Sequence, residues 1–190
     1  MLKVFRRYDK MGDAELMRRF QNDDHAAFEE IFDRYNQRIL GFFIKYTRNK
    51  PESEDLCQDL FMKLVDKKHQ FDVEKPFAPW VFRIASNMAK TNYTKIQRLE
   101  FQGHEINQDH ASNNDSLAER IELKNEIRLL VEQLTEPHKT TFILRHYTSL
   151  SIKEVATVMN CSEGTIKSRL FTTHKRLKSD LKTTQNATNF

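Results

Sequence analysis

The chain has 190 residues, of which 38% are hydrophobic, 11% aromatic and 31% charged. This apolar fraction is sufficient for packed cores, so the composition excludes an intrinsically disordered protein. The two cysteines, Cys57 and Cys161, form no CxxC pair, and neither a disulfide scaffold nor a zinc site is indicated. These features fit a reducing, cytosolic setting.

Charge is unevenly divided along the chain. Residues 1–98 and 135–190 carry net positive charge, whereas residues 99–134 carry net negative charge. Two basic blocks separated by an acidic one indicate two units that meet a polyanion. No segment approaches the roughly 20 apolar residues of a membrane span, and the basic N-terminus lacks the apolar core of a signal peptide. We therefore expect a cytoplasmic protein.

The predicted elements are helices, because apolar residues recur every three or four positions and no run alternates as a strand does. Residues 13–47 predict two helices separated by the polar break QNDDH. The next helix follows Pro51 in PESEDLCQDLFMKLV and turns an acidic face outward, with Asp55, Gln58 and Asp59 on it. Its apolar stripe is expected to contain Leu56, Cys57, Leu60, Phe61, Leu64 and Val65.

A loop with two prolines, HQFDVEKPFAPW, leads into a basic helix. Pro79 suits the first turn of that helix. Arg83, Asn87, Lys90 and Thr94 recur at spacings of three and four on the side opposite the apolar stripe. The sequence therefore predicts one packed face and one basic, amide-bearing face.

Residues 100–116 contain almost no large apolar side chains and are rich in Asn, Asp, Gln and Ser, so we expect a flexible linker there. The resulting organisation is a helical domain over 1–99, the linker, a second helical domain over 117–182 and a disordered tail over 183–190.

SIKEVATVMNCSEGTIKSRL has the layout of a helix-turn-helix. Ser151 and Glu154 fit a capping box, Asn160 suits a left-handed turn residue, and Ser162 caps the second helix. That second helix is expected to bury Ile166, Leu170 and Leu177. Its opposite side presents side chains able to contact bases or phosphates, namely Lys167, Ser168, Phe171, Thr172 and Lys175.

Together these segments resemble a bacterial RNA polymerase sigma factor of the extracytoplasmic-function (ECF) subfamily, over residues 13–98 and 117–180. EDLCQDLFMKLV resembles the segment that binds polymerase, and FAPWVFRIASNMAKTNYTK resembles the segment that melts and reads the −10 element. LTEPHKTTFILRHYTSLSIKEVATVMNCSEGTIKSRL resembles the domain that reads the −35 element. The resemblance implies an all-α protein with a region 2-like bundle and a four-helix region 4-like domain.

The resemblance also implies roles for individual residues. Contact with the coiled coil of the largest polymerase subunit is expected of Asp55, Gln58, Asp59 and Phe61, although Phe61 also fits the core. Binding of the opened −10 strand is expected of Phe71, Arg83, Asn87 and Lys90. Reading of the −35 element is expected of Thr165, Lys167, Ser168, Arg169, Phe171, Thr172 and Lys175. Thr172 and His174 stand where many relatives carry arginines.

The implied partners are core RNA polymerase, promoter DNA and an anti-sigma factor, possibly anchored in a membrane. We expect no small-molecule substrate, no cofactor and no metal. An enzyme is disfavoured, because GxxxxGK[ST], GxSxG and HExxH are absent. The acidic set Glu52, Glu54, Asp55 and Asp59 lies on one helix face, whereas a nuclease metal site needs converging ligands.

The alternative function is a stand-alone helix-turn-helix regulator that binds duplex DNA without polymerase. A one-component or response-regulator protein of this kind should also carry a ligand pocket or an α/β receiver domain. Residues 1–98 indicate neither strands nor a Gly-rich switch.

Overall fold

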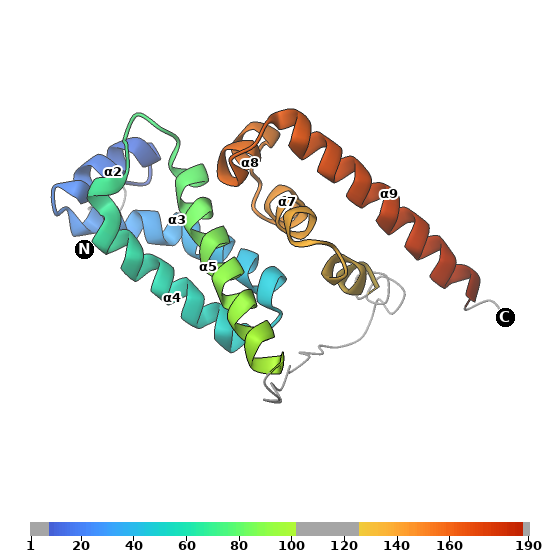
Figure 1. Cartoon of the computed structure of the whole chain (residues 1–190). Coiled ribbons are helices and arrows are strands. Elements are labelled where there is room, and N and C mark those ends of the chain that lie inside the picture. The colour runs from blue at the N-terminus through green and yellow to red at the C-terminus, as the bar shows by residue number, and fades with distance from the viewer. Residues whose placement is uncertain (1–7, 102–125, 188–190) are drawn as a thin grey trace, which may run out of the picture. The chain divides into compact units, whose positions relative to one another are not determined.

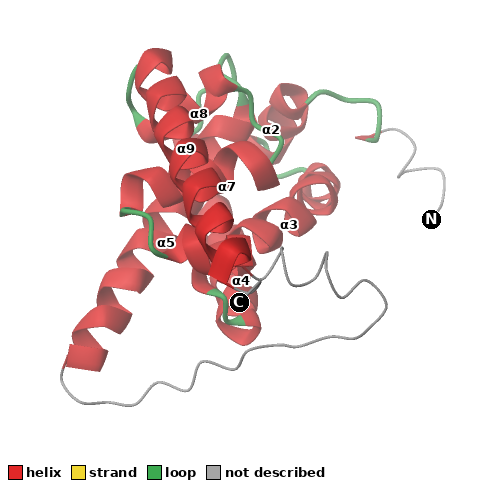
Figure 2. Cartoon of the chain, turned by 90° about the vertical axis from the view of Figure 1, so that its right-hand side faces the viewer, coloured by secondary structure: helices red, strands yellow, loops and turns green. Residues whose placement is uncertain are grey.

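The computed structural model describes residues 8–101 and 126–187, with side chains described for 8–95 and 126–181. Every regular element in these ranges is a helix (Figure 2), which confirms the predicted all-α class. The chain divides into two compact units, Met1–Asp109 and His110–Phe190. Within the described ranges, none of the helices combines the length and the apolar character that a membrane crossing needs.

Over the residues that the structure describes, the helices of the first unit that can be given bounds are four α-helices and a short 3-10 helix (Figure 1). They are α2 (Asp13–Gln21), α3 (His25–Thr47), α4 (Lys50–Lys67), η1 (Lys68–Gln70) and α5 (Phe77–Phe101). The break between α2 and α3 falls at the polar stretch that the sequence indicated. Asp24 caps α3, where its side chain accepts from the backbone N–H of Ala27 at 3.3 Å.

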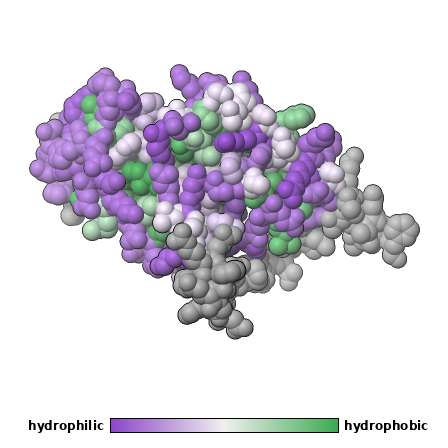
Figure 3. Space-filling view, in the orientation of Figure 1, coloured by the Kyte–Doolittle hydropathy of each residue, from purple (hydrophilic) through white to green (hydrophobic). Residues whose placement is uncertain are grey.

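The core of the first unit is formed by the inward faces of all four α-helices. Its largest fully buried side chains are Leu16, Met17, Ile31, Ile39, Phe42, Phe43, Leu60, Leu64 and Phe82. The space-filling view in Figure 3 is mostly hydrophilic on the visible face, with small scattered apolar areas. Burial of this apolar stripe from each helix is the main source of stability.

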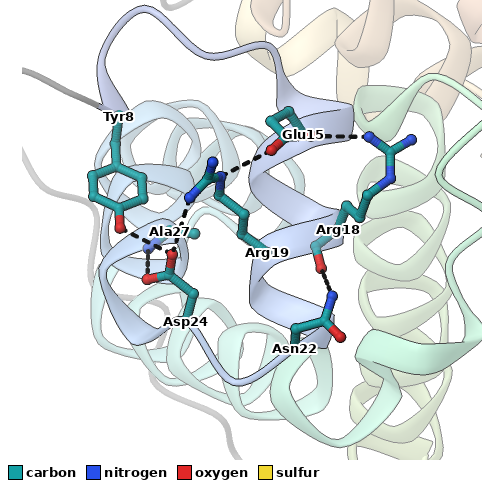
Figure 4. A network of polar contacts seen from close by, with 7 residues as sticks. All are labelled: Tyr8, Glu15, Arg18, Arg19, Asn22, Asp24 and Ala27. Carbon is teal, nitrogen blue, oxygen red and sulfur yellow. Dashed lines mark hydrogen bonds and ion pairs between the residues drawn. The ribbon is translucent and has the colours of Figure 1, made fainter.

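A polar network joins α2 to the start of α3 (Figure 4). Arg19 donates to Glu15 at 2.9 Å and lies 3.9 Å from the carboxylate of Asp24. The hydroxyl of Tyr8 donates to the same Asp24 carboxylate at 2.9 Å. Asp24 therefore both caps α3 and anchors the segment that precedes α2.

The second unit has a helical segment at 126–132, followed by α7 (Glu136–Tyr147), α8 (Ile152–Met159) and α9 (Glu163–Ala187). Figure 1 shows α8 at the N-terminal end of the long α9, with α7 beside it. A core cluster of Val131, Leu134, Phe142 and Leu177 packs with Ile127 and Leu130. Thr135 and Pro137 occupy the predicted start of α7, although the Thr135 side chain makes no cap bond and contacts His138 instead.

Two predicted boundaries differ from the structure. Helix α5 continues through Phe101, and α9 continues through Ala187, so 183–187 are helical and not the start of a disordered tail. After the first turns of the two helices, residues 80–101 and 165–187 contain no Gly or Pro, so no helix-breaking residue ends either helix earlier. Most of the predicted linker, 102–116, and residues 188–190 lie outside the described residues.

Candidate nucleic-acid and protein interfaces

Helix α4 presents the predicted acidic face. Asn49 caps the helix by accepting from the backbone N–H of Glu52 at 3.0 Å, and Pro51 lies in the first turn. The buried side of the helix consists of Ser53, Cys57, Leu60, Phe61 and Leu64. The three polar residues Asp55, Gln58 and Asp59 point away from that side and are exposed. Their predicted exposure is confirmed, which leaves the three side chains accessible to a partner.

Phe61 lies under this face and not on it. It is only 5% exposed, and its ring centroid lies 4.6 Å from that of Phe32 on α3. The accessible apolar surface beside it is provided by Phe32, Met62 and Val65, which are 38%, 66% and 40% exposed. Val65, which the sequence placed on the buried stripe, is therefore partly exposed in the structure.

Phe71 is a core residue. It is 4% exposed, and its ring lies 5.5 Å from Phe77 and 5.0 Å from Trp80, measured between centroids. The side-chain amide of Gln21 donates to the carbonyl oxygens of Lys68 and Phe71 at 2.8 and 2.9 Å, which fixes the loop. A ring buried in this way has no free face for a base, which argues against the stacking role that the resemblance implied.

Helix α5 separates an apolar face from a polar one. Val81, Phe82 and Ala85 are fully buried, whereas Arg83 and Asn87 are exposed and Lys90 is half-buried. The predicted two-sided helix is thus confirmed. Exposed guanidinium, amide and ammonium groups along one side of a helix are suited to a nucleic-acid strand.

A groove of about 370 Å³ lies between α4 and α5 and connects the acidic face to the basic one. Its polar lining consists of Asp59, Lys63, Lys67, Asn87, Thr91, Asn92 and Lys95, and its apolar lining of Leu56, Ile84 and Met88. The side-chain amide of Asn92 donates to the carboxylate of Glu52 and joins the two helices. The three lysines were missed by sequence reasoning, because they face each other only after α4 and α5 pack.

The helix-turn-helix forms as the sequence predicted. Ser151 and Glu154 make both hydrogen bonds of a capping box, and Asn160 ends α8 in the left-handed conformation with φ of 50°. Ser162 accepts from the backbone N–H of Thr165 at 3.1 Å at the start of α9. The hydroxyl groups of Ser162 and Thr165 also lie 2.9 Å apart, so the Thr165 side chain takes part in the cap.

The outer side of α9 carries the residues predicted to read DNA. Ile166, Leu170, Thr173 and Leu177 are buried on the inner side. The exposed side contains Lys167, Ser168, Phe171, Thr172 and Lys175. Phe171 is 71% exposed and so does not belong to the core. Arg169 is half-buried at the edge, with its Nη1 4.0 Å from the sulfur of Cys161.

His174 has a neighbour that the sequence did not reveal. Its Nε2 lies 3.1 Å from the Nε2 of His146 on α7. His174 therefore contacts another helix of its own unit.

The two units match two family models, "Sigma-70 region 2" over residues 31–99 and "Sigma-70, region 4" over residues 124–177. An RNA polymerase sigma-H factor from Pseudomonas aeruginosa is 31% identical over 175 residues, which span 84% of this chain and 88% of that protein. An ECF sigma-E factor from Haemophilus influenzae is 28% identical over 91% of this chain and 97% of that protein.

The chain belongs to the ECF sigma factors. This sigma factor is a non-catalytic subunit of RNA polymerase that directs transcription initiation, as the sequence resemblance implied.

Solved structures share the fold. CnrH, determined in complex with the cytosolic domain of CnrY, aligns over 90% of this sigma factor with a TM-score of 0.70 and 19% identity. RpoE of Bartonella quintana, determined with the anti-sigma factor NepR, aligns over 82% with a TM-score of 0.67 and 24% identity. The overall helical fold is therefore common to these proteins.

Proposed function

We propose that this sigma factor divides promoter recognition between its units, with 1–99 binding polymerase and the −10 element and 117–182 binding the −35 element. The observation that carries this division is the presence of an exposed nucleic-acid-type face in each unit, on α5 and on α9. The alternative of a stand-alone duplex regulator is not retained, because the family acts with RNA polymerase.

In the first unit, α4 is the docking helix for the largest polymerase subunit. The exposed side chains of Asp55, Gln58 and Asp59 supply charge and hydrogen bonds. Phe61 supports α4 from the core and does not contact polymerase itself. The apolar contact with polymerase comes from its exposed neighbours Phe32 and Met62. An interface with an apolar centre and a charged edge is typical of stable protein complexes.

The opened −10 strand binds along α5. Asn87 offers an amide to a base edge, while Arg83 and Lys90 bind the backbone. Lys63, Lys67 and Lys95 extend the positive charge into the groove between α4 and α5. Lysines in a groove favour a phosphate backbone, so the groove continues the path of the strand.

The second unit reads the −35 element with α9 in the major groove. Lys167 contacts a guanine edge and Phe171 a thymine methyl, while Ser168 and Thr172 bond to bases or phosphates. Arg169, Thr165 and Lys175 position the helix on phosphates. The threonine at 172 and the engagement of His174 with His146 leave fewer cationic contacts than in relatives with arginines there.

Regulation by an anti-sigma factor follows from the family and is supported by the solved relative bound to NepR. Such a partner would cover the polymerase-binding and DNA-binding faces. The protein acts in the cytoplasm, where its polymerase is found.

Run-off transcription with purified core polymerase on a candidate promoter tests the proposal, with permanganate mapping of the open bubble. Transcripts and a bubble that depend on this sigma factor are expected. Reactivity near −10 should be lost when Asn87 and Arg83 are both replaced by Ala, while the holoenzyme still assembles. A bubble that is unchanged in this double variant would assign −10 binding to other residues.

A further inference from the structure

Two histidines from different helices of the second unit meet at their ring nitrogens. The Nε2 atoms of His146, near the end of α7, and His174, on α9, are 3.1 Å apart. The ring centroids are separated by 5.2 Å with an angle of 67° between the ring planes. Both side chains are exposed, so water and ions can reach them.

Phe142 holds the two imidazoles in place. It is 7% exposed and belongs to the core cluster of the unit. Its ring centroid lies 4.5 Å from that of His146 and 6.0 Å from that of His174. The helices fix the backbone positions and Phe142 supports the rings, so the nitrogen pair is preorganised and does not depend on chance side-chain motion.

The separation of the nitrogens matches that of two ligands on one metal ion. Zinc–imidazole bonds of about 2.0–2.1 Å place two nitrogens about 3.3 Å apart in tetrahedral geometry and about 2.9 Å apart at a right angle. We propose that His146 and His174 form a binding site for a divalent transition-metal ion such as Zn²⁺ or Ni²⁺. Imidazole nitrogen is a preferred ligand for these ions.

The site is an open one. No cluster of three or more His, Cys, Asp or Glu side chains suited to a metal was found in the part of the chain that the structure describes. Two histidines therefore supply the protein ligands, and water completes the coordination shell. Such a site binds more weakly than a structural zinc site with four protein ligands, and the ion exchanges readily with solvent.

The protonation of the pair is compatible with metal binding. Without metal, one Nε2–H donates to the Nε2 lone pair of the other ring. With metal, both Nε2 lone pairs bind the ion and each ring keeps its proton on Nδ1, so two neutral rings lose no net proton.

Metal binding would join α7 to the helix that reads DNA. His174 lies one turn after Phe171 on α9, and His146 lies near the end of α7. Because the ligands converge only in the folded unit, the ion binds the native state and stabilises it. The site therefore offers a means of coupling metal availability to the rigidity of the −35-reading helix.

Titration of the full-length, tag-free chain with Zn²⁺ tests the site by calorimetry and by thermal unfolding with and without a chelator. The variants are His146→Gln and His174→Gln, since glutamine keeps a hydrogen-bonding group but binds these ions poorly. His138→Gln is the matched control, because His138 is on the same α7 helix and contacts Thr135. Circular dichroism in chelator shows that each variant is folded.

Wild type and His138→Gln should show the same saturable site and the same rise in melting temperature. His146→Gln and His174→Gln should each lower the affinity for Zn²⁺ by about tenfold or more. Even the loss of a residue that hydrogen-bonds to a metal ligand weakens metal binding by about 10- to 100-fold. Unchanged binding in both variants, or no saturable binding by wild type, would overturn the proposal.

A measurement on wild type alone covers the case in which a variant fails to fold. In ¹⁵N–¹H spectra of the imidazoles, Zn²⁺ should shift the Nε2 signals of His146 and His174 together and leave His138 in place. A shift confined to other histidines would also contradict the site.

Discussion

Phe171 and Leu170 are consecutive residues on α9, yet 71% of Phe171 is exposed to solvent and only 8% of Leu170 is. Consecutive side chains of an α-helix point about 100° apart, so Leu170 can face the core while Phe171 faces solvent. A large apolar side chain left this accessible has a small role in folding. The pair therefore allows stability and DNA recognition to be separated within one helical turn.

Replacement of Phe171 by Ala should leave the melting temperature of the second unit unchanged and reduce open-complex formation at promoters with an intact −35 element. Replacement of Leu170 by Ala should destabilise the unit by about 2–5 kcal/mol, because it leaves a cavity in the core. Thermal unfolding and run-off transcription measure the two effects. Equal loss of stability in both variants would contradict the assignment of Phe171 to DNA.

Lys167 and Arg169 should differ in what they recognise. Lys167 is exposed on the outer face, whereas Arg169 is half-buried at its edge. Lys167→Ala should relax the preference at one upstream base pair, since a base contact is lost. Arg169→Ala should weaken binding to all promoter sequences alike. It should also reduce the slope of log affinity against log salt concentration by about 1. Holoenzyme binding to a set of single-base-pair variants at several salt concentrations measures both, and the opposite pattern would exchange the roles.

Asp59 should contribute to polymerase binding through its charge. Asp59→Lys should weaken assembly with core enzyme, because it reverses an exposed charge on the docking face of α4. Glu74→Lys is the control: it makes the same change in net charge in the loop before α5, at a side chain that is 82% exposed and belongs to neither α4 nor α3. Affinity for core polymerase, measured by fluorescence anisotropy, should fall only for Asp59→Lys. An equal effect of both changes would indicate a response to net charge alone.

The features that could be predicted from the sequence are the ones that depend on local rules. The capping box at Ser151, the left-handed residue Asn160 and the polar break between α2 and α3 each follow from a few neighbouring residues, and all three are present. The outer face of α9 also follows from helical periodicity, because the positions three and four residues apart share a side.

The features that were missed depend on packing between distant segments. Phe71 lies in a loop, where periodicity gives no information, and its burial results from contact with Phe77 and Trp80. Val65 continues the apolar pattern of α4, yet 40% of it remains exposed after the helices have packed. His146 and His174 are 28 residues apart, and only the crossing of α7 with α9 brings them together.

Arg34 should be important for the stability of the first unit. Its guanidinium donates to Glu30 at 2.6 Å, to Asp13 at 3.0 Å and to the carbonyl oxygens of Tyr8, Asp9 and Met11 at 2.7–3.0 Å. Lysine cannot reproduce this fork, so Arg34→Lys should lower the free energy of unfolding by about 2 kcal/mol and expose the segment before α2 to proteolysis.

Arg18→Lys is the control for Arg34, because Arg18 forms an exposed ion pair with Glu15 and should change stability by less than about 1 kcal/mol. Urea unfolding followed by the fluorescence of Trp80, the one tryptophan of the chain, reports on this unit. Similar stabilities of the two variants would show that the Arg34 contacts do not anchor the segment.

The thiol of Cys57 should be protected from alkylation in the folded protein. It should also make the free energy of unfolding depend on pH in the alkaline range. The thiol is 4% exposed, lies 3.4 Å from Oδ1 of Asn36, and has its pKa raised by burial to about 11. In the unfolded chain a cysteine has a pKa of about 8.5, so between these values the unfolded state loses the proton and the folded state keeps it. The contribution of the Cys57 thiol to the free energy of unfolding is therefore complete below the pKa of the unfolded state. It is lost as the pH rises toward the pKa of the folded state. The difference in unfolding free energy between wild type and Cys57→Ala should shrink over that range. Iodoacetamide should label Cys161 in the folded protein and Cys57 only after unfolding, and rapid labelling of Cys57 in the native state would contradict its burial.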